Sequence, residues 1–158
     1  DYVYRKPATG GSWSKIATLK SSVLQYKDSK VTANSSYRYT VRAYYQANGK
    51  NYLSKYTTGP VIKAAPALQK VSSVKSETNG IRILWSTQKK CDGYYIYRKK
   101  KGGSYQLIRK ISDKNFSSYL DKKAQKGVSY YYAVKAYVKE PYGNTYSKYK
   151  SSSAVKRK

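Results

Sequence analysis

Tyrosine, lysine and arginine are the abundant residues of this sequence whose side chains could carry chemistry. The 158 residues include 21 tyrosines and 33 lysines and arginines, but no histidine. Without histidine, the usual acid–base catalysis and most metal sites are excluded. The seven aspartates and glutamates are scattered, which argues against a paired-carboxylate glycosidase site. We therefore expect no catalytic residue, no metal and no cofactor.

Cys91 is the single cysteine and cannot form an intramolecular disulfide. This fits either a reducing compartment or a bacterial surface protein that relies on packing instead of disulfides. A nucleophilic cysteine needs a base, and the usual one, histidine, is missing. We interpret Cys91 as a structural or adventitious cysteine.

The formal net charge of +26 favours anionic partners. Nucleic acid, wall polymers, sulfated or sialylated glycans and anionic membrane surfaces all fit a field of this sign. The charges recur along the chain instead of forming one block, so a lysine-coated, soluble exterior explains them equally well. No apolar run reaches the length of a transmembrane helix, and we expect no membrane insertion.

Two tyrosine-rich stretches, 36–44 and 129–137, indicate how these side chains are positioned. In both, apolar or aromatic residues alternate with polar or basic ones at a period of two, which predicts β-strands. The stretches lie 93 positions apart, as do Asp28 and Asp121, so the repeat has the size of a domain. The predicted inward side chains are Tyr37, Tyr39, Val41 and Ala43 in the first copy, and Tyr130, Tyr132, Val134 and Ala136 in the second.

The opposite, outer faces mix aromatic and cationic side chains. Aromatic rings stack on sugars or bases, and cations between them hold carboxylates, sulfates or phosphates. Cross-strand pairing of the same rings stabilises a sheet without any ligand, and this alternative stays open. The candidate binding residues are Tyr2, Tyr4, Arg38, Arg42 and Tyr44 in the first unit, and Tyr95, Tyr97, Tyr131, Lys135 and Tyr137 in the second.

Further alternating stretches complete each unit. A short strand is predicted at 24–28 and again at 118–121, in each case ending at an aspartate. Strands at 68–74 and 81–85 have no counterpart in the first unit, so we expect its missing pair to be supplied by upstream residues or by a neighbouring chain. The predicted domains are 1–63 and 68–158, joined by a linker at 64–67.

Three stretches of the chain resemble parts of tandem fibronectin type III-like domains of bacterial extracellular proteins. They are Leu84-Trp85, Asp92-Gly-Tyr-Tyr-Ile-Tyr-Arg98 and Tyr130-Tyr-Tyr-Ala-Val-Lys-Ala136. The resemblance implies an all-β fold of two tandem, immunoglobulin-like β-sandwiches, the first lacking its two N-terminal strands. It also implies that Trp85 packs between the sheets and that Tyr130 and Tyr37 form tyrosine corners. The wealth of Tyr and Lys, with no Met or His, is similar to repeats in surface proteins of Gram-positive gut bacteria.

For function, the resemblance implies a non-catalytic binding or adhesion module, extracellular and either cell-surface or secreted. Its expected partner is a host protein, such as a glycoprotein or an immunoglobulin, or an anionic glycan or wall polymer. One alternative is an accessory or spacer segment of a secreted carbohydrate-active enzyme. Another is nonspecific binding of polyanions or nucleic acid, but beyond charge the sequence has no nucleic-acid motif.

Overall fold

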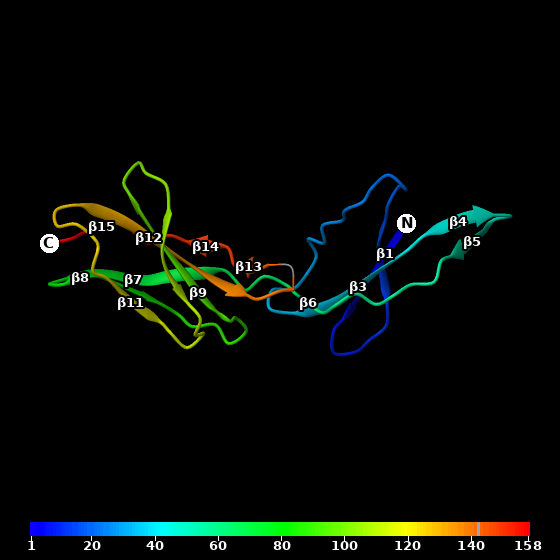
Figure 1. Ribbon diagram of the computed structural model, residues 1–158, viewed down its shortest axis with the longest axis horizontal. Helices are drawn as coiled ribbons and strands as arrows, with labels where there is room; N and C mark the ends of the chain where they lie inside the picture. Colours follow the sequence, from blue (N-terminus) through cyan, green and yellow to red (C-terminus); the bar gives the residue numbers. More distant parts are fainter. Residues whose placement is uncertain (142) are drawn as a thin grey trace. The chain divides into compact units, whose positions relative to one another are not determined.

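The chain folds as two compact β-sheet units, Asp1–Ala64 and Ala65–Lys158. The computed structural model describes residues 1–141 and 143–158, and in these residues regular structure consists of β-strands without α-helices (Figure 1). The all-β prediction is confirmed.

Unit 1 is built on one antiparallel sheet in the order β2-β1-β3-β6. A separate hairpin, β4-β5, turns at Asn48 and Gly49, whose φ angles of 49° and 71° are the left-handed values that such a turn requires. The strands are β1 (Tyr2–Pro7), β2 (Ser14–Thr18), β3 (Ser36–Arg42), β4 (Tyr44–Ala47), β5 (Lys50–Leu53) and β6 (Ile62–Lys63).

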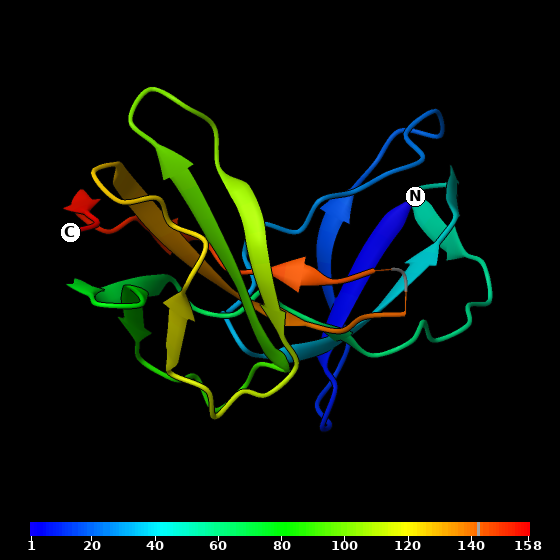
Figure 2. The same ribbon diagram turned by 60° about the vertical axis from the view of Figure 1, so that its left-hand side comes forward.

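Unit 2 is a sandwich of two sheets. One sheet has the order β11-β8-β7-β14, and the other has the order β10-β9-β12-β13 with β15 also paired to β12. Figure 2 shows β9 and β10, in green and yellow-green, side by side in the second sheet. The strands are β7 (Gln69–Glu77), β8 (Gly80–Trp85), β9 (Gly93–Lys100), β10 (Gln106–Ile111), β11 (Ser118–Asp121), β12 (Ser129–Val138), β13 (Thr145–Tyr146), β14 (Tyr149–Lys150) and β15 (Val155–Lys156).

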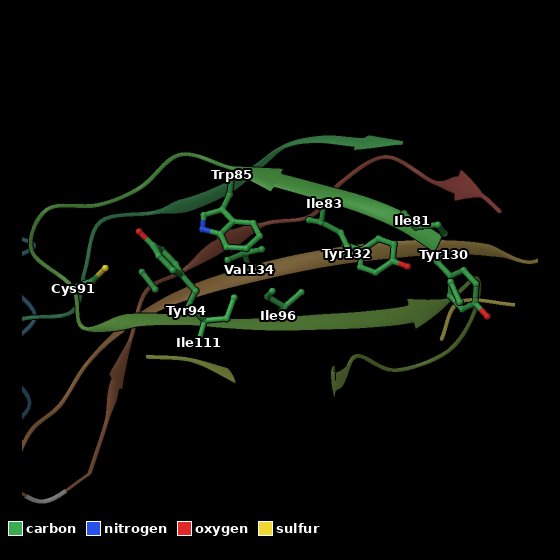
Figure 3. Close-up of a cluster of buried hydrophobic side chains, with 12 residues drawn as sticks. Ile81, Ile83, Trp85, Cys91, Tyr94, Ile96, Ile111, Tyr130, Tyr132 and Val134 are labelled. Carbon is green, nitrogen blue, oxygen red and sulfur yellow. The ribbon is translucent and has the colours of Figure 1, made fainter. Parts of the chain in front are cut away.

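The distribution of strands between these sheets is that of a fibronectin type III-like sandwich. The first, second and fifth long strands of unit 2 form one sheet, and the third, fourth and sixth form the other. Between them lies a core in which alternate residues of β8, β9 and β12 meet (Figure 3). Ile81, Ile83, Ile96 and Val134 have no exposed surface, and Trp85 packs on Tyr94 at 5.5 Å between ring centroids.

The sheet of unit 1 lacks such a cover on part of its inner side. Val3 is buried there, but its cross-strand neighbour Val41 is 54% exposed. The prediction that Val41 faces a core is therefore wrong. The predicted strand at 24–28 does not form either, because no neighbouring strand pairs with this segment in the described structure. An extended segment becomes a strand only when a partner satisfies its backbone groups.

Candidate binding surface on the outer sheet faces

The pairing of β9 with β12 sets the outer face of unit 2. Tyr95 lies opposite Lys135, and Lys99 lies opposite Tyr131. Directly opposed residues of an antiparallel pair point to the same side, so these four side chains share one face with Tyr97. The structure thus brings together four of the five site residues predicted for this unit.

Lys135 lies between two aromatic rings on this face. Its Nζ is 5.3 Å from the ring centroid of Tyr97 and 5.3 Å from that of Tyr149. Tyr149, which belongs to β14, also meets Tyr105 edge-on at 5.7 Å. The ammonium of Lys99 lies 5.0 Å from the centroid of Tyr105. Rings and cations therefore alternate across the sheet, each within the range of a cation–π contact.

The fifth predicted residue, Tyr137, requires a correction. The alternation predicts that its ring faces water, but Tyr137 is 3% exposed. Tyr95 covers it at 5.1 Å and Tyr146 at 6.4 Å between ring centroids, and its hydroxyl donates to Ser112. Since strand β13 brings Tyr146 onto this side of the sheet, the ring is sealed by neighbouring aromatic side chains. Tyr137 is a packing residue and not a contact residue.

The outer face of unit 1 has the same kinds of contact between aromatic rings and cations. Tyr2 stacks on Tyr44 at 4.0 Å, with the ammonium of Lys15 over its ring at 4.1 Å. The guanidinium of Arg42 lies 5.4 Å from the ring centroid of Tyr56 and donates to the carbonyl of Ser54 at 2.8 Å. Stacked rings and ring–cation contacts therefore also hold the side chains of this face in place.

Two remaining predicted residues of unit 1, Tyr4 and Arg38, lie along the same face. Tyr4 meets Tyr2 edge-on at 6.4 Å. Arg38 lies opposite Lys6 in the sheet and donates to the carbonyl of Gly59 at 3.2 Å. All five predicted residues of unit 1 are therefore found on this side.

The two outer faces repeat their contacts at the offset of 93 positions. Arg42 over Tyr56 corresponds to Lys135 over Tyr149. The amide of Asn51 donates to the Tyr2 hydroxyl at 3.2 Å, and 93 positions later Asn144 donates to the Tyr95 hydroxyl at 3.4 Å. The same offset links Tyr56 with Tyr149 and Lys6 with Lys99, and an offset of 92 links Trp13 with Tyr105. These offsets could have identified the ring and cation partners that sequence reasoning missed.

Two of these phenols, Tyr97 and Tyr146, have a pKa raised above its ordinary value. Burial raises the pKa of Tyr97, and the neighbouring rings of Tyr146 and Tyr95 raise it further. Burial also raises the pKa of Tyr146. An ordinary phenol is already neutral at physiological pH, and the raised pKa extends the neutral range of these two rings, so they add no charge to that of the lysines and arginines.

Three residues assigned to the framework lie on the inner side. Trp85 is 3% exposed in the core of unit 2. The Tyr130 hydroxyl accepts a hydrogen bond of 3.1 Å from the backbone N–H of Gln125. The Tyr37 hydroxyl accepts the equivalent bond, also 3.1 Å, from Thr32, and this bond lowers the Tyr37 pKa. Both tyrosines thus tie a strand to the loop that precedes it.

Within the described ranges, 1–141 and 143–158, the donor groups do not form a metal centre. No three cysteine, aspartate or glutamate side chains gather there in a group that could hold a metal ion. The same residues include no helix with the length and hydrophobicity needed to span a membrane.

Comparison with known proteins gives matches among solved structures alone. No family model and no curated protein matches the chain. The FN1–FN3 domains of chicken CNTN1 match with a TM-score of 0.49 and 21% identity, covering 99% of this chain and 56% of that one. A segment of two fibronectin type III domains from chicken tenascin matches with a TM-score of 0.45 and 18% identity, covering 98% and 82%. This chain spans about half the length of the first matched chain, and neither similarity assigns a function.

Proposed function

We propose that this chain is a non-catalytic pair of extracellular binding modules from a bacterial surface or secreted protein, and that its outer faces contact an anionic polymer. The polymer is a glycan or wall polymer that carries sulfate, carboxylate or phosphate groups. The observation that carries the proposal is the repeated placement of a cation over an aromatic ring, Arg42 over Tyr56 and Lys135 over Tyr149.

The excess of cations supports an anionic partner. The seven acidic side chains can neutralise at most seven of the 33 lysines and arginines, which leaves the formal charge of +26. Asp28 and Asp121 are already engaged on the inner sides of the two sheets, by Arg5 and Arg98. A polymer with regularly spaced anions can therefore meet uncompensated cations on both units.

The aromatic rings support a sugar-based polymer over a purely ionic one. Tyr149 is 39% exposed, and the Tyr131 ring flanks the same lysine, Lys99, that lies over Tyr105. Exposed ring faces next to ammonium groups suit alternating apolar and anionic parts of a charged glycan. Rings fixed by their neighbours also lose little conformational entropy on binding.

The experiment compares two double variants of equal charge. Lys99→Gln with Lys135→Gln removes two cations from the outer face of unit 2, and Lys75→Gln with Lys123→Gln removes two exposed cations elsewhere. Binding to a sulfated glycan and to a phosphate-rich wall polymer is measured at low and moderate salt. We expect the first variant to bind at least about tenfold more weakly, the second to change about twofold or less, and affinity to fall steeply with salt. Equal losses in both variants would show diffuse charge binding and contradict the proposed site.

A protein partner is the second candidate, because tyrosine and arginine are enriched at protein interfaces. Tyr131→Ala separates the two possibilities. A protein captured from host extract in a salt-resistant manner, and lost on this substitution, would replace the polymer as the partner. Capture that disappears in moderate salt supports the polymer.

A further inference from the structure

A hollow of about 430 Å³ opens at one edge of unit 2, and we call it the edge pocket. Strand β10 is the outermost strand of one sheet and β11 that of the other, and residues 112–117 connect them. Figure 2 shows this connection, in yellow, crossing from β10 to β11. The pocket is lined by residues 109–113, Phe116 and Tyr119. A volume of this size is sufficient for a small molecule or for one sugar residue.

Two aromatic side chains give the edge pocket an apolar wall. Phe116 is the single phenylalanine of the chain, and it is 51% exposed. Tyr119 packs against the core of unit 2 but keeps part of its surface open. The pocket therefore offers ring surfaces against which the C–H face of a sugar ring can pack.

A guanidinium without a partner lies in the same pocket. Arg109 pairs with Ile96 across the β9–β10 ladder, so its side chain lies on the inner side of its sheet. Among the residues that the structure describes, Arg109 has no hydrogen bond and no ion pair. Arg98 of the same sheet is by contrast paired with Asp121 at 2.8 Å. Arg109 therefore keeps its N–H donors for a ligand, in a fork that fits a carboxylate.

The edge pocket also has partners for hydroxyl groups. In the described part of the chain the Tyr119 hydroxyl has no hydrogen bond. Burial raises the pKa of this phenol, Asp121 raises it further and Arg109 lowers it, so the phenol is a neutral donor near the guanidinium. The Asp113 carboxylate accepts the Asn115 N–H at 2.8 Å through one oxygen, which leaves the other oxygen for a ligand hydroxyl.

The charges of the edge pocket select a ligand with one negative group. Arg109 and Asp113 both line the pocket, yet they form no ion pair with each other within the described residues. Lys110 adds a second cation, whose ammonium lies 5.3 Å from the ring centroid of Tyr95. Two cations and one carboxylate leave a single positive charge. The carboxylate of Asp113 repels a second anionic group but accepts a hydroxyl.

An extended acidic peptide fits this pocket less well. Such a peptide would add to the free edge of β10 through its backbone. The register of β10 against β9 shifts between Leu107 and Arg109, so a bulge interrupts this edge. Beyond the bulge only residues 109–111 pair regularly, fewer than the roughly five or six of a usual strand. The pocket therefore favours a compact ligand.

We propose that the edge pocket binds a sugar acid, a hexose ring with one carboxylate, as a single residue of a glycan. The Arg109 guanidinium binds the carboxylate, the sugar ring lies against Phe116, and Asp113 and Tyr119 bind its hydroxyls. The inference rests on the proposed function only in making the sugar part of a polymer. Binding of the sugar itself does not depend on the outer faces, whose predicted residues do not line the pocket.

The test titrates the full chain with three probes and follows its backbone amides by NMR. The probes are methyl glucuronide, the neutral methyl glucoside and acetate. We expect saturable shifts at residues 109–119 with methyl glucuronide, and at least about tenfold weaker binding of the other two, because each lacks either the charged group or the ring. Equal binding of the glucoside or of acetate overturns the proposal. Tighter binding of a blocked acidic tripeptide also overturns it.

Two variants locate the sugar within the pocket. Arg109→Gln should weaken binding of methyl glucuronide at least about tenfold, because it removes the charged donor. Phe116→Ser should weaken it at least about threefold, and Phe116→Tyr, which keeps the ring, should restore it. Both replaced side chains are exposed, so the amide spectrum should show that the fold is kept.

The control of equal charge is Lys75→Gln, which removes an exposed cation elsewhere in unit 2. It should change binding of methyl glucuronide about twofold or less, as expected for an exposed charge outside the pocket. Equal losses in Lys75→Gln and Arg109→Gln would show diffuse attraction and overturn the proposal. Polymer binding without any saturable shift from methyl glucuronide would leave the outer-face function standing and overturn the edge pocket. Saturable sugar binding without polymer binding would overturn the outer-face function alone.

Discussion

The Tyr132 hydroxyl donates a hydrogen bond of 2.8 Å to the carboxylate of Asp121, and both side chains are buried inside unit 2. The same carboxylate oxygen accepts a bond of 2.8 Å from Arg98. Its other oxygen accepts the backbone N–H of Lys123 at 3.1 Å. A carboxylate that is buried to this degree persists because hydrogen bonds and a cation replace its water.

Replacement of Asp121 should therefore destabilise unit 2 strongly. Asp121→Asn removes the charge opposite Arg98 and leaves a guanidinium that is 24% exposed without its carboxylate. We expect the free energy of unfolding to fall by about 3 kcal/mol. This is the lower end of the range for breaking a buried ion pair, because Arg98 is partly exposed to solvent. Chemical denaturation measures it. Glu77→Gln, which breaks the exposed pair with Arg82, is the control and should cost less than about 1 kcal/mol. Similar losses in both variants would contradict the role of burial.

Unit 1 should lose stability in acid through Asp28. Burial alone raises the pKa of this carboxyl, but hydrogen bonds from the Lys30 amide, Arg5 and Tyr39 outweigh burial and lower it. Because the folded pKa lies below the unfolded value of about 4, the stabilisation is complete above that value. It is lost as the pH falls through the folded pKa. Unfolding followed between pH 5 and pH 2 should show this decline, and Asp28→Asn should flatten it. An unchanged slope in the variant would contradict the assignment.

Alkaline pH should destabilise unit 2 through Tyr132. Burial raises the pKa of this phenol, and its hydrogen bond to Asp121 raises it further. A folded pKa above the unfolded value of about 10 means that the contribution is complete below pH 10 and is lost as the pH rises beyond it. Tyr132→Phe should therefore lower stability at pH 7 and weaken the decline above pH 10. If stability declined equally above pH 10 in the variant and the parent, Tyr132 would not be the source of the alkaline destabilisation.

Two valines at equivalent positions provide a matched test of how the inner side of each unit is covered. Val134 has no exposed surface, whereas Val41 is 54% exposed. Val134→Ala should cost about 2 kcal/mol of unfolding free energy because it removes two buried methyl groups and leaves a cavity. Val41→Ala should cost less than about 0.5 kcal/mol, as a surface substitution does. Comparable costs, measured by chemical denaturation, would mean that Val41 is covered in solution.

The alternation of apolar and polar residues along the sequence correctly predicted which side chains of β12 face the core of unit 2. The period of two in 129–137 identified β12 and its buried side chains Tyr130, Tyr132 and Val134, and the offset of 93 linked them to the first unit. The physical reason is that successive strand residues point to opposite sides, whatever the neighbouring strands are. The all-β fold follows from the same regularity.

Neighbouring strands decided the features that the pattern could not predict. Tyr137 lies on the outer side as its position requires, yet it is buried because Tyr146 of β13 and Tyr95 of β9 close over it. Val41 occupies an inner position, yet it is exposed because unit 1 has no strand placed as β8 is over Val134.

The sequence by itself determined most of the strands, which side of each strand a residue occupies and how much positive charge the chain carries, but it wrongly predicted a strand at 24–28. The tertiary structure decided which of those sides are covered and which cations meet which rings, such as Lys135 between Tyr97 and Tyr149. The reason is that side-chain direction follows from the geometry of one strand. Exposure and ring–cation contacts instead depend on residues far away in the chain, whose arrangement is fixed when the sheets pack.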